Sequence, residues 1–235
     1  EFDFEALPPQ DRYRLLCSFV APRPIALVTT CDAEGRPNAA PMSFFNVFSQ
    51  DPPIVILGIQ AKPCGSEKET LRNIRRSQEF TVNLCDMAIA QQMVDCGIGF
   101  PDDVDVVELT GLSHAPSLKI APARVEEAPA AMECRVSQII DYPRRAIVLG
   151  EVGQMHVRDA CLDAAGRYVR PEVYQPVARL HADNYIVSDR QFELTDRARV
   201  DVLYGAKATA LMIDRSGSVK GVLVRDANGS RGVSA

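Results

Sequence analysis

The sequence predicts a mainly β protein in which antiparallel strands form a closed or partly closed barrel, with peripheral helices and a C-terminal β-hairpin. Two observations lead to this fold class. Short apolar or alternating stretches recur along the chain and are joined by turn residues, with helical patterns inserted between some of them. The 235 residues, 46% apolar and 24% charged, suffice for one large β-rich domain with an appendage.

The first elements are a helix and a hairpin. Residues 10–20 have apolar side chains at helical spacing, and Pro22 and Pro24 end the pattern. Strands at 25–30 and 38–43 flank a Gly-containing turn, which is typical of a β-hairpin.

A strand, a helix and a further strand follow. The strand at 54–59 begins directly after two prolines, a position where proline is tolerated. Residues 66–76 have a capping-box pattern, with Ser66 as the predicted N-cap and Glu69 three positions later. Residues 80–84 form the next predicted strand.

The remainder of the barrel region alternates between regular and irregular segments. Residues 86–96 are predicted to be helical, and residues 99–122 have the prolines and glycines of a loop. Long strands at 131–142 and 145–157 are separated by a turn. An irregular stretch with one short helix near 171–176 follows.

The last forty residues differ in composition from the rest. Residues 195–235 hold seven Lys and Arg against four Asp and Glu, and they lack Cys, Pro and His. Stretches at 208–213 and 219–225 form a predicted hairpin. We therefore expect a domain at 1–194 and a β-rich tail at 195–235, which is interpreted as a fusion remnant or as a terminal hairpin that packs on the barrel.

Composition argues against two kinds of partner. The net charge of -5 disfavours nucleic acid, which would favour a basic face. The longest apolar run, at 54–59, is far short of the roughly 20 residues of a membrane helix. The acidic N-terminal segment has no apolar core, so no signal peptide is expected.

The cysteines and histidines suggest neither a disulfide framework nor a metal site. The seven cysteines are odd in number and contain no CxxC pair, and the three histidines are widely spaced. We expect buried or idle thiols in a reducing cytoplasm.

One stretch has no explanation in the fold alone. Residues 38–46, NAAPMSFFN, are poor in aliphatic side chains although they follow a predicted hairpin turn. A backbone that closely approaches a flat polar ligand would account for this composition.

Several segments, in order, resemble the flavin reductase-like family with an FMN-binding split-barrel fold. The similar segments are RPIALVTT with NAAPMSFFN, SEKETLRNI with SQEFTVNL, MEC, IVLGEV, YQPVARL and DNY. They cover roughly residues 8–194, and the subgroup most similar to them includes the small components of two-component monooxygenases. The resemblance implies a homodimer with FMN at the subunit interface, NADH or NADPH as electron donor, and a flavin-dependent monooxygenase as a possible partner.

The FMN phosphate is a dianion and requires cations, hydroxyls and backbone N–H groups, such as those at a helix N-terminus. Lys68 and Thr70 lie in the first turn of the predicted 66–76 helix, with Ser66 at its cap. The Lys-acidic-Thr-x-x-Asn-Ile segment of the family adds Asn73, and Arg23 is a candidate second cation. The alternative for Lys68 is an ordinary solvated helix residue.

The isoalloxazine ring needs hydrogen bonds at its polar edge and apolar walls. Strand alternation allows only one of the two adjacent phenylalanines to face the ring, and the other belongs to the core. Thr29 could equally be a strand residue chosen for its β-propensity. The candidate ring contacts are Thr29, Asn38, Ser43, Phe44, Phe45 and Asn46.

Hydride transfer from a nicotinamide to flavin requires positioning rather than an acid–base pair, so no catalytic side chain is predicted. Short reductases of the superfamily often have Gly-Asp-His before the late strand, and residues 142–145 of this chain read Tyr-Pro-Arg-Arg instead. This departure leaves open an FMN-binding electron-transfer protein without nicotinamide turnover. The unusual tail leaves open a second alternative, a binding module that has lost flavin. The two arginines are either contacts for a nucleotide phosphate or part of a solvated turn.

The tail resembles a strand-rich segment of FAD-dependent fumarate reductase or tricarballylate dehydrogenase-type flavoproteins. The similar pattern is VDVLY followed by GSVKGVLVRD. No G-x-G-x-x-G occurs in the chain, so an FAD pyrophosphate site is not expected.

Overall fold

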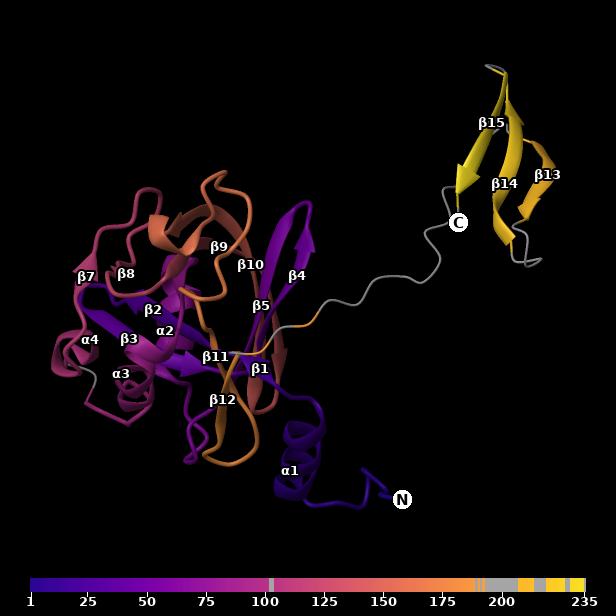
Figure 1. The fold of residues 1–235 in the computed structure, drawn as a ribbon. Helices are drawn as coiled ribbons and strands as arrows, with labels where there is room; N and C mark the ends of the chain where they lie inside the picture. The colour runs from indigo at the N-terminus through magenta and orange to yellow at the C-terminus, as the bar shows by residue number, and fades with distance from the viewer. Residues whose placement is uncertain are drawn as a thin grey trace. The chain divides into compact units, whose positions relative to one another are not determined.

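Seven strands of the computed structural model form one antiparallel sheet in the order β3-β2-β6-β9-β10-β5-β4 (Figure 1). Their bounds are β2 Ala26–Cys31, β3 Pro37–Met42, β4 Phe45–Gln50, β5 Pro53–Gln60, β6 Glu79–Leu84, β9 Ala130–Tyr142 and β10 Arg145–Val157. The predicted mainly β, antiparallel fold is therefore confirmed. The long β9–β10 hairpin lies where the sequence predicts it, because a turn separates two stretches of strand-forming residues.

The structure describes residues 1–101, 104–188, 190, 192, 207–213, 219–226 and 229–234. The chain divides into two compact units, Glu1–Arg190 and Gln191–Ala235. The boundary predicted at 194/195 lies outside the described residues and stays a prediction.

A corner at Ser43 and Phe44 joins the two edge strands of the barrel sheet. β3 and β4 follow each other along the chain, yet they occupy opposite edges of the sheet. The carbonyl of Phe44 accepts a hydrogen bond from the N–H of Gly58 at 2.8 Å, which ties the corner to β5. The sequence prediction missed β4, because the corner reverses the facing pattern within a run that is poor in aliphatic residues.

The helices lie outside this sheet (Figure 1). Their bounds are α1 Pro9–Phe19, α2 Glu69–Ser77, η1 Met87–Ile89, α3 Ala90–Asp95, α4 Val106–Leu109 and η2 Asp159–Cys161. No helix among the described residues is long and apolar enough to cross a membrane. The short helix predicted near 171–176 is wrong: a single turn forms there, in which the N–H groups of Val173 and Tyr174 both donate to the carbonyl of Arg170 at 3.0 Å.

Two small sheets complete the N-terminal unit. β1 Arg23–Pro24, β11 Val177–Arg179 and β12 Tyr185–Val187 pair in the order β1-β11-β12, and β7 His114–Ala115 pairs with β8 Arg124–Val125. These strands are only two or three residues long. Such short pairings gave no periodic signal in the sequence.

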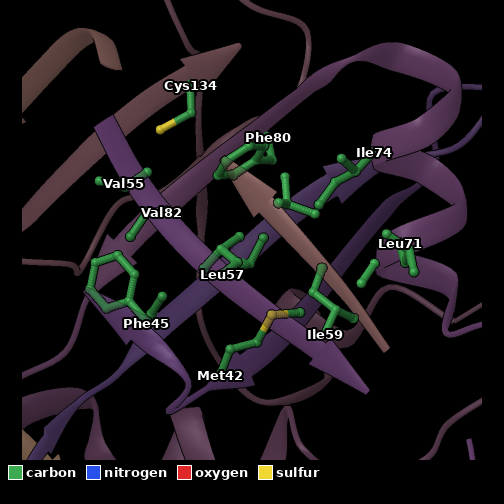
Figure 2. Close-up of a cluster of buried hydrophobic side chains, with 14 of the residues drawn as sticks. Met42, Phe45, Val55, Leu57, Ile59, Leu71, Ile74, Phe80, Val82 and Cys134 are labelled. Atoms are coloured by element: carbon green, nitrogen blue, oxygen red, sulfur yellow. The ribbon is translucent and has the colours of Figure 1, made fainter. Parts of the chain in front are cut away.

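The core of the barrel lies between the strands and α2. Figure 2 shows Phe80 and Val82 of β6 beside Leu57 of β5, with Leu71 and Ile74 entering from α2. Gly150 of β10 lies against this core, because a Cβ atom at that position would be 2.3 Å from Cζ of Phe80.

A second buried cluster lies between the opposite face of β2 and the segments that carry α3 and α4. It includes Leu27, Met93, Val107 and Val125. β2 is therefore covered on both faces, which accounts for the uninterrupted burial of that strand.

A buried carboxylate fastens the 117–122 loop to the barrel. Glu133 of β9 accepts hydrogen bonds from the N–H groups of Leu118 and Lys119, both at 2.7 Å, and from Nε2 of His156 at 2.6 Å. Burial alone would raise the pKa of Glu133, but the hydrogen bonds from Leu118, His156 and Lys119 outweigh it, and the pKa lies below its ordinary value.

The C-terminal unit is a three-stranded antiparallel sheet in the order β13-β14-β15. β13 is Lys207–Ile213, β14 is Val219–Asp226 and β15 is Gly229–Ser234. The predicted pairing of the first two strands is confirmed, and the third strand was not predicted.

Candidate functional site

A hollow of about 630 Å³ opens beside the N-terminal end of α2. It is lined by residues 38–41 of β3, the 62–64 loop, residues 68–70 and residues 96–101. We call it the polar hollow, because the side chains that distinguish it are Asn38, Lys62, Lys68 and Thr70.

Below the polar hollow, four buried polar side chains join α2 to β2 and β3. Nδ2 of Asn38 donates to Oγ1 of Thr70 at 3.0 Å and to Oγ1 of Thr30 at 3.4 Å. Nδ2 of Asn73 donates to the same Thr30 oxygen at 3.2 Å. All four are at most 8% exposed, so this cluster orients Asn38 and Thr70 without help from solvent.

The rim of the polar hollow carries two lysines and one carboxylate. Lys68 is the N-cap residue of α2 and is exposed, Glu69 begins the helix, and Lys62 lies on the facing loop. The N-terminus of α2 adds the partial positive charge of the helix dipole and the N–H groups of its first turn. Cations beside a helix N-terminus favour an anion such as a phosphate.

An exposed thiol, Cys64, also lines the polar hollow. Its Sγ lies 3.0 Å from Oγ of Ser66, and this hydrogen bond lowers the pKa of Cys64. The other six cysteines are buried, and burial raises the pKa of Cys85 and of Cys134 to about 12. The expectation of buried thiols is therefore confirmed for six of the seven.

A second hollow of about 780 Å³ adjoins the first. We call it the apolar hollow; the residues that characterise it are Met42, Ser43, Met93, Arg179 and Tyr185.

The two hollows meet where β3 approaches the end of α3, since Pro41, Gly97 and Ile98 line both. A Cβ atom at Gly97 would lie 3.2 Å from Cγ of Pro41 and 3.0 Å from the carbonyl oxygen of Val94. This close approach keeps the segment at residue 97 against β3.

The structure brings four of the predicted site residues to these hollows. Asn38, Lys68 and Thr70 line the polar hollow, and Ser43 lines the apolar hollow. Asn73 lies in the buried cluster below and supports Thr30 rather than lining the hollow.

Three predicted ring contacts lie elsewhere. Phe45 is 7% exposed in the barrel core, where Figure 2 shows it, so its role as a wall of the ring is corrected to that of a core residue. Phe44 lies on the outer side of the corner, with its ring centroid 5.6 Å from Cζ of Arg145 and 6.0 Å from Cζ of Arg23. Asn46 is exposed on β4, and its Oδ1 accepts from the N–H of Val47.

Thr29 faces away from α2, because strand alternation places Thr30 on that side instead. Oγ1 of Thr29 donates to the carbonyl of Ala123 at 2.5 Å and accepts from Nδ2 of Asn83. Thr29 therefore has a structural role in this chain, and its neighbour Thr30 is the threonine that joins the buried cluster below the polar hollow. Its pairing opposite Asn38 in the β2–β3 register was the available signal.

Arg23 and Ser66 also differ from their predicted roles. The buried Arg23 guanidinium donates to the carbonyls of Cys17, Val20 and Leu180, which holds α1 to the β11–β12 connection instead of a phosphate. Ser66 lies in the loop three residues before α2, and the N-cap Lys68 makes no side-chain capping bond, so the predicted capping box is wrong.

Other residues of the hollows were not predicted. Lys62 and residues 97–101, GIGFP, reach the polar hollow, and Arg179 and Tyr185 reach the apolar one. The glycines at 97 and 99 were the signal for a close backbone approach, but Gly97 lay between the predicted helix and the predicted loop, and Gly99 was taken as the start of that loop.

The arrangement suits a ligand with an anionic end and a flat, largely apolar end, which are the features of FMN. Lys62, Lys68 and the α2 N-terminus would hold a phosphate at the polar hollow, and the apolar hollow offers wall area with a polar group at Ser43. Among the residues that the structure describes, no group of His, Cys, Asp and Glu could hold a metal ion.

Comparison with known proteins identifies the family of this barrel. Residues 19–175 match the family described as flavin reductase like domain. The chain belongs to this family. The resemblance seen in the sequence is thus confirmed for the barrel, and flavin binding is the function that membership supports. The resemblance of the tail to FAD-dependent flavoproteins stays a prediction.

Relatives and solved structures agree with this assignment. An uncharacterized protein of Deinococcus radiodurans is 38% identical over 184 residues, which are 76% of this chain and 81% of the relative. The structure of Pseudomonas fluorescens 2-nitrobenzoate 2-nitroreductase NbaA has 35% identity and a TM-score of 0.77, covering 85% of this chain and 98% of that one. Nitrilotriacetate monooxygenase component B of Bacillus cereus has 30% identity and a TM-score of 0.78, covering 83% and 98%.

Proposed function

We propose that this flavin reductase-like protein binds FMN and acts as an NAD(P)H:flavin oxidoreductase. The observation that carries the proposal is the junction of the two hollows at Pro41, Gly97 and Ile98, which joins a cationic, hydrogen-bonding compartment to an apolar one. A cofactor with a phosphate at one end and a flat ring at the other matches that order.

Each compartment has its own task. Lys68 and Lys62 bind the phosphate, with Thr70 oriented by Asn38 below it. Ser43 and the residues around Pro41 face the ring, and the apolar walls exclude water from it. FMN itself supplies the chemistry by accepting hydride at N5 from NADH or NADPH, so the chain needs to position the two rings rather than to move protons.

The β9–β10 turn is the proposed contact for the nucleotide. Nη2 of Arg144 donates to the carbonyl of Pro63 at 3.4 Å, and the carbonyl of Arg144 accepts from the N–H of Ala61 at 3.0 Å. This turn therefore lies against the loop that walls the polar hollow, where an arginine could meet a pyridine nucleotide phosphate.

The visible spectrum of the purified chain with FMN, then with NADH and NADPH, tests the function. A perturbed flavin band that bleaches with either nucleotide supports the reductase. A perturbed band that does not bleach would leave an electron-transfer protein without nicotinamide turnover. An unperturbed band would leave a binding module that has lost flavin, and would contradict the proposal.

We also propose a homodimer and a monooxygenase partner. The homodimer is supported by large apolar side chains exposed on β4 and α1, among them Phe48 at 71% and Phe19 at 82%. The partner is supported by the similarity to a monooxygenase component B. Sedimentation equilibrium of the wild type and of Phe48→Glu tests the dimer: a monomer in the wild type, or an unchanged dimer in the variant, would exclude β4 as its interface.

Direct reduction of a nitroaromatic compound is a second candidate, favoured by the 35% identity to a 2-nitrobenzoate nitroreductase over 85% of this chain. Electrons would then pass from the nicotinamide to an acceptor in the apolar hollow instead of to free flavin. In the absence of oxygen, nucleotide oxidation that needs only catalytic FMN and stops when the nitroaromatic is exhausted would favour this candidate. Oxidation in proportion to free flavin would favour the first.

A further inference from the structure

The small β1-β11-β12 sheet turns a single cationic side chain toward the apolar hollow. Arg179 and Tyr185 pair across β11 and β12 and line that hollow, whereas the next pair, Ala178 and Ile186, lines a different one, as strand alternation requires. Val177 lines both. Arg179 therefore reaches the hollow from a hydrogen-bonded strand, not from a loose loop.

The guanidinium of Arg179 is held in place and still has donor capacity. It donates to the hydroxyl of Tyr185 and to the carbonyl of Ala182, and its Cζ lies 4.7 Å from the centroid of the Tyr185 ring. It also donates to Oδ1 of Asp183 at 3.1 Å. An arginine has five N–H donors, and Nε of Arg179 has no acceptor among the described residues.

The carboxylate beside Arg179 neutralises it only weakly. The Asp183 side chain is 102% exposed, whereas that of Arg179 is 26% exposed. A fully solvated partner contributes little to an ion pair, because water and salt screen it. A carboxylate delivered on a ligand from within the hollow would be less solvated and would bind the guanidinium more strongly.

The other side chains that line the hollow favour a ligand whose carboxylate is attached to an aromatic ring. Met42, Met87 and Met93 all line the hollow, and thioethers adapt their shape and make favourable contacts with aromatic rings. Arg179 and Asp183 are the only charged residues that line it among those described.

We propose that the apolar hollow binds an aromatic carboxylic acid at its Arg179 and Tyr185 end, and that Arg179 selects it by binding its carboxylate. This inference rests on the proposed function, in which the flavin ring lies at the Ser43 and Pro41 end of the same hollow, and it adds the chemical class of the molecule bound beside the ring. Asp183 is the competitor that the ligand carboxylate displaces.

The test measures binding of 2-naphthoate and of its neutral analogue 2-naphthamide to the full chain by calorimetry, with and without FMN. The wild type should bind the acid about tenfold more tightly than the amide, as expected for a charge-assisted hydrogen bond. Arg179→Met should abolish that preference and leave amide binding unchanged. Asp183→Asn should tighten acid binding about twofold, since it removes an exposed competing carboxylate.

Equal binding of acid and amide by the wild type would overturn the inference. So would an Arg179→Met variant that keeps the preference but loses about tenfold in FMN affinity, because Arg179 would then be a cofactor contact. If Arg179→Met does not fold, Asp183→Asn decides alone, and unchanged or weaker acid binding overturns the inference. Failure of FMN binding contradicts the proposed function separately, because the acid preference is measured without FMN as well.

Discussion

The two hollows are built by different physical means although they adjoin. The polar hollow rests on side-chain hydrogen bonds between Asn38, Thr70, Thr30 and Asn73, all buried between α2 and the sheet. The apolar hollow is bounded by a small sheet and in part by exposed side chains, such as Met87 at 55%. The polar hollow is therefore pre-organised for an anion, whereas the apolar hollow offers area and one cation.

This difference has a measurable consequence for binding. Interactions of exposed lysines with a phosphate weaken with added salt, whereas burial of an aromatic ring between apolar walls does not. For one ligand that spans both hollows, the contacts in the polar hollow would weaken with added salt, and those in the apolar hollow would not.

The largest expected effect is a loss of stability of the barrel, on which both hollows depend. Gly150→Ala places a Cβ atom 2.3 Å from Cζ of Phe80, and we expect it to destabilise the barrel unit by about 1–3 kcal/mol or more. Urea unfolding monitored by circular dichroism measures the loss. Gly153→Ala on the same strand is the control, because its nearest atoms would lie at 3.9 Å. Equal effects of the two substitutions would show that Gly150 is not tightly packed.

Lys68→Ala should affect ligand binding at the polar hollow and leave binding at the apolar hollow unchanged. We expect FMN affinity to fall more than about tenfold, since the phosphate loses its cation at the N-terminus of α2, while binding of 2-naphthamide is unchanged. Fluorescence quenching of FMN measures the affinity at two salt concentrations. Lys68→Arg should retain most of it. Unchanged FMN affinity in Lys68→Ala would show that this lysine does not bind the phosphate.

Thr70→Val tests the buried cluster below the polar hollow. The substitution leaves Nδ2 of Asn38 without its 3.0 Å acceptor, which we expect to cost about 1–3 kcal/mol in unfolding free energy and to weaken FMN binding. Thermal melting and FMN titration measure the two effects. Thr70→Ser keeps the hydroxyl and is the matched control. A valine variant as stable as the serine variant would contradict the importance of this bond.

Low pH should destabilise the barrel, and with it both hollows, through protonation of Glu133. Its pKa is lower in the folded chain than in the unfolded chain, so its ionised form stabilises the fold above the ordinary pKa near 4.5. That stabilisation is lost as pH falls through the lower folded pKa. Urea midpoints between pH 6 and pH 3 should therefore decline more steeply in the wild type than in Glu133→Gln. Parallel profiles would assign the acid sensitivity to other carboxylates.

The smallest expected effect is protection of Cys64. Iodoacetamide should modify this exposed thiol before the six buried ones, and saturating FMN should slow the reaction several-fold because the thiol lines the polar hollow. Mass spectrometry of the labelled peptide measures the rate, and Cys64→Ser identifies the signal. Binding of 2-naphthamide should give no protection, and protection by both ligands would mean that the hollows do not act separately.

The local secondary structure and the family of this protein could be predicted from its sequence alone. Local patterns predicted α1, the β2–β3 and β9–β10 hairpins and the β13–β14 pair, because apolar periodicity and turn residues act over a few neighbouring positions. The order of the motifs identified the family, and the helix at 69–77 with its lysine and threonine was predicted as part of the site.

Only the tertiary structure decided which side chains meet. It placed Thr30 rather than Thr29 below the polar hollow, sent Phe45 into the core, and brought Arg179 to the apolar hollow from the far end of the unit. These outcomes depend on a corner at residues 43–44 and on two-residue strand pairings such as β1–β11. Such contacts leave no periodic trace in the sequence, because each involves only one or two residues and a partner outside the local pattern. The partner of Phe44 is Gly58, and that of Arg23 is the carbonyl of Leu180, more than a hundred residues away.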